Sequence, residues 1–283
     1  MELGVGSETF AALEVGDAAG KPCVYLHGFP DHPPTAQPFL EALAARGYRV
    51  LAPWLRGYRP SPVDGRFDVE SLAIDIAGVI AAWPGSGGGD VRVDVVGHDW
   101  GAAITYQLCT AHADRVARAV TLALPHPLTF LRQLRTAAQA RRSWYMALFQ
   151  LPGSGRLARA HDLALVDRLW RAWSPGFTLD DAQRADLHAC LADSLPGPLE
   201  PYRAIARPLG DVGERLRRAA RPIATPLLQL HGADDGCVLP PTLDDARRFT
   251  GPRQLEVVPG VGHFLHLEQP AAIAARAADW LAG

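Results

Sequence analysis

The stretch 97–101 constrains the fold of this chain more than any other feature. Gly97 and Gly101 flank the three residues His98, Asp99 and Trp100. A β-branched run over 91–96 precedes this stretch and predicts a buried strand, while residues 102–108 predict a helix. Two flanking glycines are what a strained strand-to-helix turn needs, because a side chain at either position would collide with neighbouring backbone. We therefore expect a tight turn that presents Asp99 at the end of a strand.

Strand and helix patterns alternate on both sides of this turn. Short apolar runs bounded by Gly, Asp and Pro predict strands at residues 9–15, 23–26, 50–55, 119–124, 226–230 and 254–258. Helical periodicity and end signals predict helices at residues 34–46, 69–83 and 268–281. This alternation predicts an α/β fold with a mostly parallel central sheet and helices on both faces.

The alternation stops between residues 127 and 221. This stretch is helical in pattern, with breaks at Pro152-Gly153, Ser174-Pro175-Gly176 and Leu195-Pro196-Gly197-Pro198. We predict a helical insertion over 127–221 that divides the α/β core into a first part, residues 1–126, and a second part, residues 222–283.

Composition excludes several kinds of partner. A formal net charge of −2 over 283 residues gives no basic surface for nucleic acid or an anionic membrane. No stretch reaches the roughly 18 uninterrupted apolar residues of a membrane span, and the N-terminus lacks a basic region followed by an apolar run, which favours a cytoplasmic protein. The four cysteines are scattered without metal-type spacing, so we expect free thiols and no zinc site.

Three candidate catalytic side chains follow the ends of predicted strands. Asp99, Asp235 and His263 each lie just beyond such a strand, and ligands bind at this edge of a parallel α/β sheet. Their order along the chain is nucleophile, acid and histidine, as in the catalytic triad of α/β-hydrolases. Asp234 competes with Asp235 for the role of the acid.

Over nearly its whole length the chain resembles the α/β-hydrolase fold family. The motifs at 97–101, 27–30, 56–58 and 262–264 look like those of its epoxide hydrolase and dehalogenase branch. The resemblance implies that the helical insertion is a cap domain. It also implies Asp235 as the acid, because the family places that residue three positions after a glycine, here Gly232.

An acid at the apex of the turn has its own chemical consequence. A serine that attacked a saturated carbon would leave an ether, whereas a carboxylate leaves an ester whose carbonyl water can attack. Asp99 is ionised near neutral pH, and the following helix N-terminus favours its charge. His263, oriented by Asp235, is then free to activate water. The backbone N–H groups of Phe29 and Trp100 are placed to hold the oxyanion of the tetrahedral intermediate.

Two tyrosines in the insertion bear on the leaving group. An opened epoxide yields an alkoxide that needs a proton donor, while a halide needs none. The segments 143–153 and 201–204 resemble the cap segments that supply the two ring-opening tyrosines of epoxide hydrolases, with Tyr145 and Tyr202 in those places. The same resemblance implies that the substrate pocket includes His27, Pro30, Trp144 and Phe149.

We therefore predict an epoxide hydrolase that converts a small-molecule, largely apolar epoxide to a vicinal diol without a metal or organic cofactor. In a haloalkane dehalogenase Trp100 would be one halide donor, but Phe29 stands where that family often has Asn. Fluoroacetate dehalogenases carry arginine next to the nucleophile, where this chain has Trp100. A silent ligand-binding protein would usually have lost one of the five catalytic candidates, and all five are present. The epoxide's size and stereochemistry and the oligomeric state stay open.

Overall fold

The computed structural model describes residues 1–84, 92–241 and 245–283. Within them the strands form one sheet in the order β1-β2-β4-β3-β5-β6-β7-β8. The strands are β1 (Glu2–Val5), β2 (Glu8–Val15), β3 (Lys21–Leu26), β4 (Tyr48–Pro53), β5 (Val93–His98), β6 (Val116–Leu122), β7 (Leu227–Gly232) and β8 (Arg253–Val258). β2 is antiparallel to both of its neighbours, and the other strand pairs are parallel. The predicted fold class, an α/β fold with a mostly parallel sheet, is confirmed.

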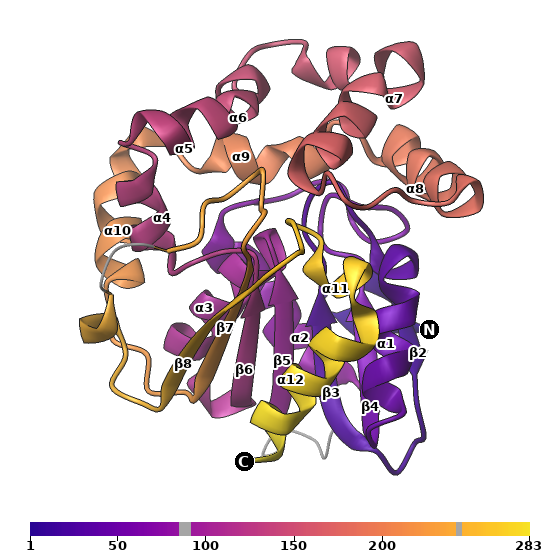
Figure 1. Ribbon diagram of the computed structural model, residues 1–283, viewed down its shortest axis with the longest axis vertical. Coiled ribbons are helices and arrows are strands. Elements are labelled where there is room, and N and C mark those ends of the chain that lie inside the picture. Colours follow the sequence, from indigo (N-terminus) through magenta and orange to yellow (C-terminus); the bar gives the residue numbers. More distant parts are fainter. Residues whose placement is uncertain (85–91, 242–244) are drawn as a thin grey trace.

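Helices cover both faces of the sheet (Figure 1). α1 packs against α12 on one face, and α2 packs against α3 on the other. These core helices are α1 (Gln37–Ala44), α2 (Val69–Ala82), α3 (Trp100–Ala111), α11 (Leu265–Glu268) and α12 (Pro270–Ala282). Short 3₁₀ turns lie at Pro33–Ala36, Ala113–Arg115, Gly197–Leu199, Leu209–Asp211 and Ala246–Arg248.

The central strand β5 leads directly into the turn at Asp99. Its side chains Val93, Val95 and Val96 are fully buried, because β3 and β6 flank the strand and helices cover both faces. The predicted strand began at Val91, which lies outside the described residues. The sequence pattern also missed β1, whose four residues include a glycine and carry little strand signal.

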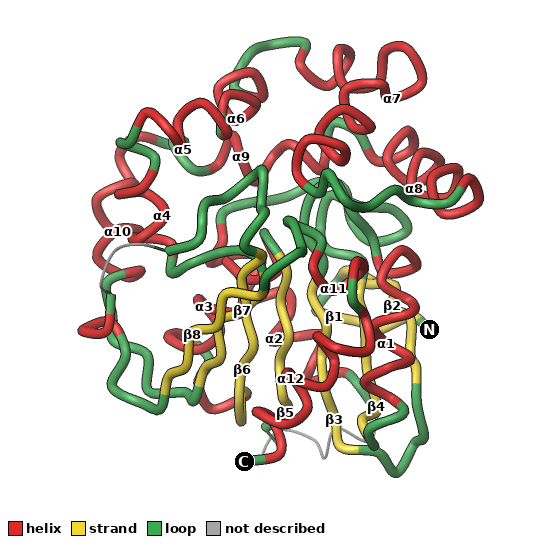
Figure 2. Tube along the Cα trace, in the orientation of Figure 1, coloured by secondary structure: helices red, strands yellow, loops and turns green. Residues whose placement is uncertain are grey.

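The stretch between β6 and β7 is helical and lies over the ends of the strands (Figures 1 and 2). Its helices are α4 (Pro127–Gln133), α5 (Ala137–Arg142), α6 (Trp144–Phe149), α7 (Ser154–Trp173), α8 (Asp181–Ser194), α9 (Glu200–Ala204) and α10 (Val212–Ala219). α7 is interrupted by non-helical backbone at Ala160–Leu163. The helices therefore form a separate layer above the loops that carry Asp99, Asp235 and His263.

Two expectations from composition can be compared with the fold. None of the described helices combines the length and the apolar character needed to cross a bilayer. The four cysteines are free thiols; Cys190 is half-buried and the other three are buried.

Candidate active site

The turn at Asp99 has the strained backbone that its glycines predict. Asp99 adopts φ 50° and ψ −114°, a positive φ that is unusual for a residue with a side chain. A Cβ at Gly97 would clash with the carbonyl of Gly101, and one at Gly101 would clash with the carbonyl of Leu26. The two glycines thus let β3, β5 and α3 approach closely enough to project Asp99 from the sheet edge.

Asp99, Asp235 and His263 come together at this edge. Nδ1 of His263 lies 2.9 Å from Oδ2 of Asp235, and Nε2 lies 3.7 Å from Oδ2 of Asp99. Within the described residues Nε2 makes no hydrogen bond. All three side chains are buried, whereas Asp234 is exposed. The histidine therefore faces one carboxylate on each side.

Asp235 is held as a carboxylate by its own loop. Its Oδ1 accepts hydrogen bonds from the backbone N–H groups of Cys237 at 2.7 Å and Val238 at 2.8 Å. Burial alone would raise the pKa of Asp235, but the charge of His263 and hydrogen bonds hold that pKa well below its ordinary value. Burial would lower the pKa of His263, yet Asp235 raises it above its ordinary value. Both shifts favour the charged forms of Asp235 and His263.

One of the two predicted oxyanion donors already contacts the nucleophile. The backbone N–H of Phe29 donates to Oδ1 of Asp99 at 2.9 Å. Trp100 is the first residue of α3, and N–H groups in the first turn of a helix have no partner within that helix. The N–H of Trp100 is therefore available as a second donor, and that role stays a prediction.

Tyr145 and Tyr202 come from α6 and α9 and lie next to each other. Their ring centroids are 5.6 Å apart, and both side chains are buried. The ring of Tyr202 also packs edge-on against Trp100 at 5.0 Å. Burial raises the pKa of both phenols well above the ordinary value, which keeps them protonated in the resting site.

The hydroxyls of these two tyrosines have different surroundings. Oη of Tyr145 lies 3.3 Å from the sulfur of Cys237. Oη of Tyr202 has no hydrogen-bond partner in the part of the chain that the structure describes. The phenol of Tyr145 thus contacts a thiol, whereas that of Tyr202 lies beside the indole of Trp100, which lowers its pKa against the larger effect of burial.

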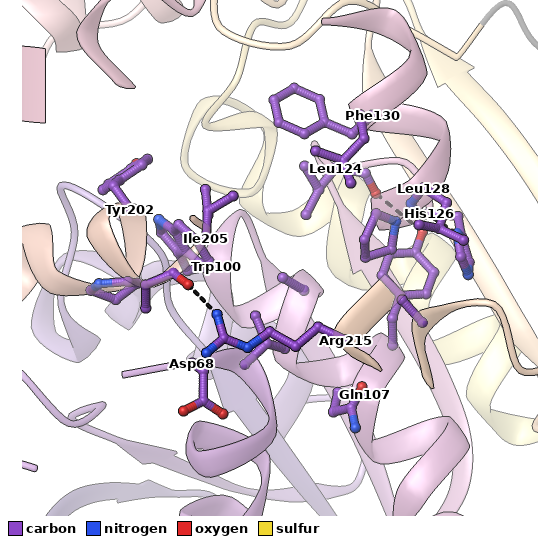
Figure 3. Close-up of a pocket in the computed structure, with 18 of the residues that line it drawn as sticks. Asp68, Trp100, Gln107, Leu124, His126, Leu128, Phe130, Tyr202, Ile205 and Arg215 are labelled. Carbon is purple, nitrogen blue, oxygen red and sulfur yellow. Dashed lines mark hydrogen bonds between the residues drawn. The ribbon is translucent and has the colours of Figure 1, made fainter. Parts of the chain in front are cut away.

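Asp99 and the two tyrosines line one cavity of about 410 Å³. Asp99, Trp100, Tyr145 and Tyr202 line it, and Figure 3 shows Trp100 and Tyr202 close together. Most of the remaining wall is apolar, including Leu124, Leu128, Phe130, Met146, Ile205 and Leu216. The guanidinium of Arg215 also borders the cavity, but it donates to backbone carbonyls of this chain. The cavity therefore suits an apolar molecule whose reactive group meets Asp99.

With this geometry established, comparison with known proteins assigns the family. The alpha/beta hydrolase family matches residues 23–276. The chain belongs to this family. The resemblance to α/β-hydrolases and the assignment of the chain as a hydrolase, both predicted from sequence, are thereby confirmed.

Several relatives of this α/β-hydrolase are epoxide hydrolases. Epoxide hydrolase A from Mycobacterium tuberculosis is 27% identical over an alignment 312 residues long. That alignment covers 96% of this chain and 93% of that protein. Epoxide hydrolase 3 from Mus musculus is 27% identical over 269 residues, and the match covers 91% of this chain and 70% of that protein. The structure of Epoxide Hydrolase A from Mycobacterium thermoresistibile, 23% identical, matches with a TM-score of 0.82 over 100% of this chain and 98% of the other. That last comparison concerns the fold alone.

The four expected pocket residues lie elsewhere than on the cavity wall. His27 is buried, and its Nε2 accepts a hydrogen bond from the backbone N–H of Leu55. The carbonyl of Pro30 accepts one from the indole N–H of Trp170. Phe149 is buried behind the tyrosines, 5.2 Å from the ring of Tyr202. Trp144 is 42% exposed on the surface of the insertion. In this α/β-hydrolase these residues support the site or face solvent, and none of them lines the cavity.

Sequence reasoning gave Glu268 no place in the site and had it only as the first residue of the helix predicted at 268–281. Its carboxylate accepts two hydrogen bonds from the N–H of Gly262, at 2.8 and 3.0 Å, and one from Oγ of Ser174 at 2.7 Å. Ser174 in turn accepts from the N–H of Phe264. Glu268 therefore fixes the loop on both sides of His263. Its only sequence signal was its position five residues after the histidine.

A second polar group lies behind the triad. Asp31, His98 and His266 are buried, and each offers a possible metal-ligand atom within 4.8 Å of the others. Nε2 of His98 lies 3.0 Å from the backbone oxygen of His263, so this group also contacts the loop that carries His263. The expectation that the enzyme needs no metal stays a prediction.

Proposed function

We propose that this α/β-hydrolase opens an epoxide to a vicinal diol through a covalent ester on Asp99. One observation carries the proposal: the carboxylate of the strained turn and two neutral, buried phenols line the same apolar cavity. The names of relatives that match most of the chain support the same reaction. We also propose that residues 127–221 form the cap domain, which supplies both phenols.

In the first step Asp99 attacks a carbon of the epoxide. Because Oδ1 accepts the N–H of Phe29, Oδ1 becomes the ester carbonyl oxygen and Oδ2 is the nucleophile. The bond from Oδ2 to carbon forms as the carbon–oxygen bond of the ring breaks. The epoxide oxygen takes a proton from a phenol of the Tyr145 and Tyr202 pair, because an unprotonated alkoxide is a poor leaving group.

In the second step His263 activates water. Formation of the ester removes the charge of Asp99, which helps to raise the pKa of His263, so the histidine then loses its proton more readily. Neutral His263 takes a proton from water, whose oxygen attacks the ester carbonyl. The N–H groups of Phe29 and Trp100 stabilise the resulting oxyanion. On collapse the departing alkoxide takes the proton from His263, and the second proton of the water passes from Asp99 back to the phenolate, so that both residues return to their starting states.

A single turnover in ¹⁸O-labelled water tests this mechanism. With enzyme in excess over an apolar epoxide, the covalent route places the label in the peptide that contains Asp99 and leaves the first diol unlabelled. Label in that first diol would mean direct attack of water on the epoxide and would contradict the proposal. The same enzyme is given chloroalkanes and bromoalkanes; halide release without diol formation would favour a haloalkane dehalogenase instead.

A further inference from the structure

Cys237 lies two residues after Asp235, in the loop that follows β7, and both of its backbone polar groups are occupied. Its N–H donates to Oδ1 of Asp235 at 2.7 Å. Its carbonyl accepts a hydrogen bond at 2.8 Å from Nε2 of Gln139, a buried residue of α5. Gln139 also accepts from the N–H of Leu239 at 2.8 Å. The position of the cysteine is therefore fixed from the core and from the helical insertion together.

The thiol of Cys237 points at one of the two tyrosines. Its Sγ is fully buried and lies 3.3 Å from Oη of Tyr145. The hydroxyl of Tyr202 contacts no thiol among the described residues and lies beside the indole of Trp100 instead. The two phenols are therefore not equivalent, although the same cavity contains both.

Either atom could be the donor of this hydrogen bond, and the chemistry of the two groups favours donation by the thiol. Sulfur is a weak acceptor, whereas a phenol oxygen accepts well and can donate its own proton elsewhere at the same time. Burial, and next the charge of Asp235, raise the pKa of the Cys237 thiol well above its ordinary value, so the thiol keeps its proton. An S–H donated to Oη of Tyr145 leaves the phenol proton free for a substrate oxygen.

We propose that Cys237 is a positioning residue whose S–H donates to Oη of Tyr145 and makes Tyr145 the phenol that gives its proton to the opening epoxide. This inference rests on the proposed function. As Oδ2 of Asp99 bonds to carbon and the ring carbon–oxygen bond breaks, the proton of Tyr145 moves to the epoxide oxygen. The S–H of Cys237 then stabilises the tyrosinate. During ester hydrolysis the second proton of the attacking water restores Tyr145, and Tyr202 donates a hydrogen bond throughout.

Single-turnover kinetics on the full-length enzyme test the role of Cys237. Rapid-quench mass spectrometry measures ester formation and ester hydrolysis separately in the wild type and in Cys237→Ala, Cys237→Val and Cys237→Ser. We expect ester formation to slow about tenfold in Cys237→Ala and Cys237→Val, as for loss of one hydrogen bond to the reacting group. Cys237→Ser, which keeps a donor, should stay within about threefold of the wild type. Ester hydrolysis should change little in any variant.

Two further measurements separate positioning from a structural role. Cys109→Ala removes another buried thiol, in α3, and should leave both steps unchanged. Adding Cys237→Ala to Tyr145→Phe should cause no further loss, since the cysteine acts through that hydroxyl. Full additivity of the two changes, or equal slowing of both steps, would overturn the role of Cys237. If the wild type forms no ester with any epoxide, the proposed function itself fails.

Discussion

The sheet edge and the helical insertion hold their functional side chains in different ways. At the sheet edge, Asp235 is fixed by two backbone N–H groups and by His263. In the insertion, neighbouring rings hold the side chain of Tyr202. The hydroxyl of Tyr145 has one polar contact, to the sulfur of Cys237. Hydrogen bonds from backbone fix atoms in one direction, while ring packing tolerates small shifts. We therefore expect the sheet edge to supply the nucleophile and the base, and the insertion to supply the proton donors and the fit to a substrate.

Removal of the nucleophile should have the largest effect. In Asp99→Ala no ester can form, so we expect kcat for an apolar epoxide to fall at least about 10⁴-fold. Steady-state diol formation measures the loss, and far-UV circular dichroism checks that the fold is retained. Residual activity within a hundredfold of the wild type would show that the sheet edge does not supply the nucleophile.

His263→Gln should stop the reaction halfway. Because ester formation needs no base while ester hydrolysis does, turnover should fall about 10³-fold and the ester should accumulate. Intact-mass spectrometry should show an adduct that carries the whole mass of the epoxide. If turnover falls without any adduct, His263 acts before the ester forms, which would contradict its assignment to ester hydrolysis alone.

Loss of the phenol groups should slow ring opening to a smaller extent. We expect Tyr145→Phe and Tyr202→Phe each to lower the rate of ester formation about 10–100-fold, because each removes one proton or hydrogen-bond donor. Presteady-state measurement of ester formation tests this, with Tyr106→Phe as a control at a wall residue whose hydroxyl bonds to Thr121 and Leu124. An unchanged rate of ring opening in both variants would show that the two tyrosines of the insertion do not take part in that step.

The buried ion pair should make stability depend on pH. Asp235 raises the folded-state pKa of His263 above the unfolded value near 6.5, so the stabilisation is complete below that pH and is lost as pH rises through the folded pKa. Between about pH 6 and pH 9 we expect wild type to lose about 1–3 kcal/mol more unfolding free energy than His263→Gln. Urea denaturation of both proteins at the two pH values measures these free energies of unfolding. Parallel pH curves for the two proteins would mean that His263 is not charged in the folded enzyme.

A change in the cavity wall should have the smallest effect. Met146 lines the cavity from α6, so Met146→Ala should shift the ratio of kcat/KM between bulky and small epoxides about two- to fivefold, as expected for a few methylene contacts. Ile74→Ala, on an exposed part of α2, serves as the matched control. An equal change for all substrates would place Met146 outside substrate selection.

Local patterns predicted the sheet edge well because its residues follow strands. The glycines around Asp99 and the strand ends before Asp235 and His263 were readable without any contact information. The same approach failed at β1, and it placed Trp144 beside Tyr145 in the pocket although Trp144 faces solvent. In a helix as short as α6, periodicity cannot tell which of two adjacent aromatic side chains points inward.

The sequence alone determined that an acid occupies a strained turn, because the two glycines that such a turn needs stand beside Asp99 in the chain. Tertiary structure alone decided what each phenol contacts. Tyr145 and Cys237 are 92 residues apart in the chain, and no local pattern links them. Packing of the insertion on the core brings the two together, so the difference between Tyr145 and Tyr202 exists only in the folded enzyme.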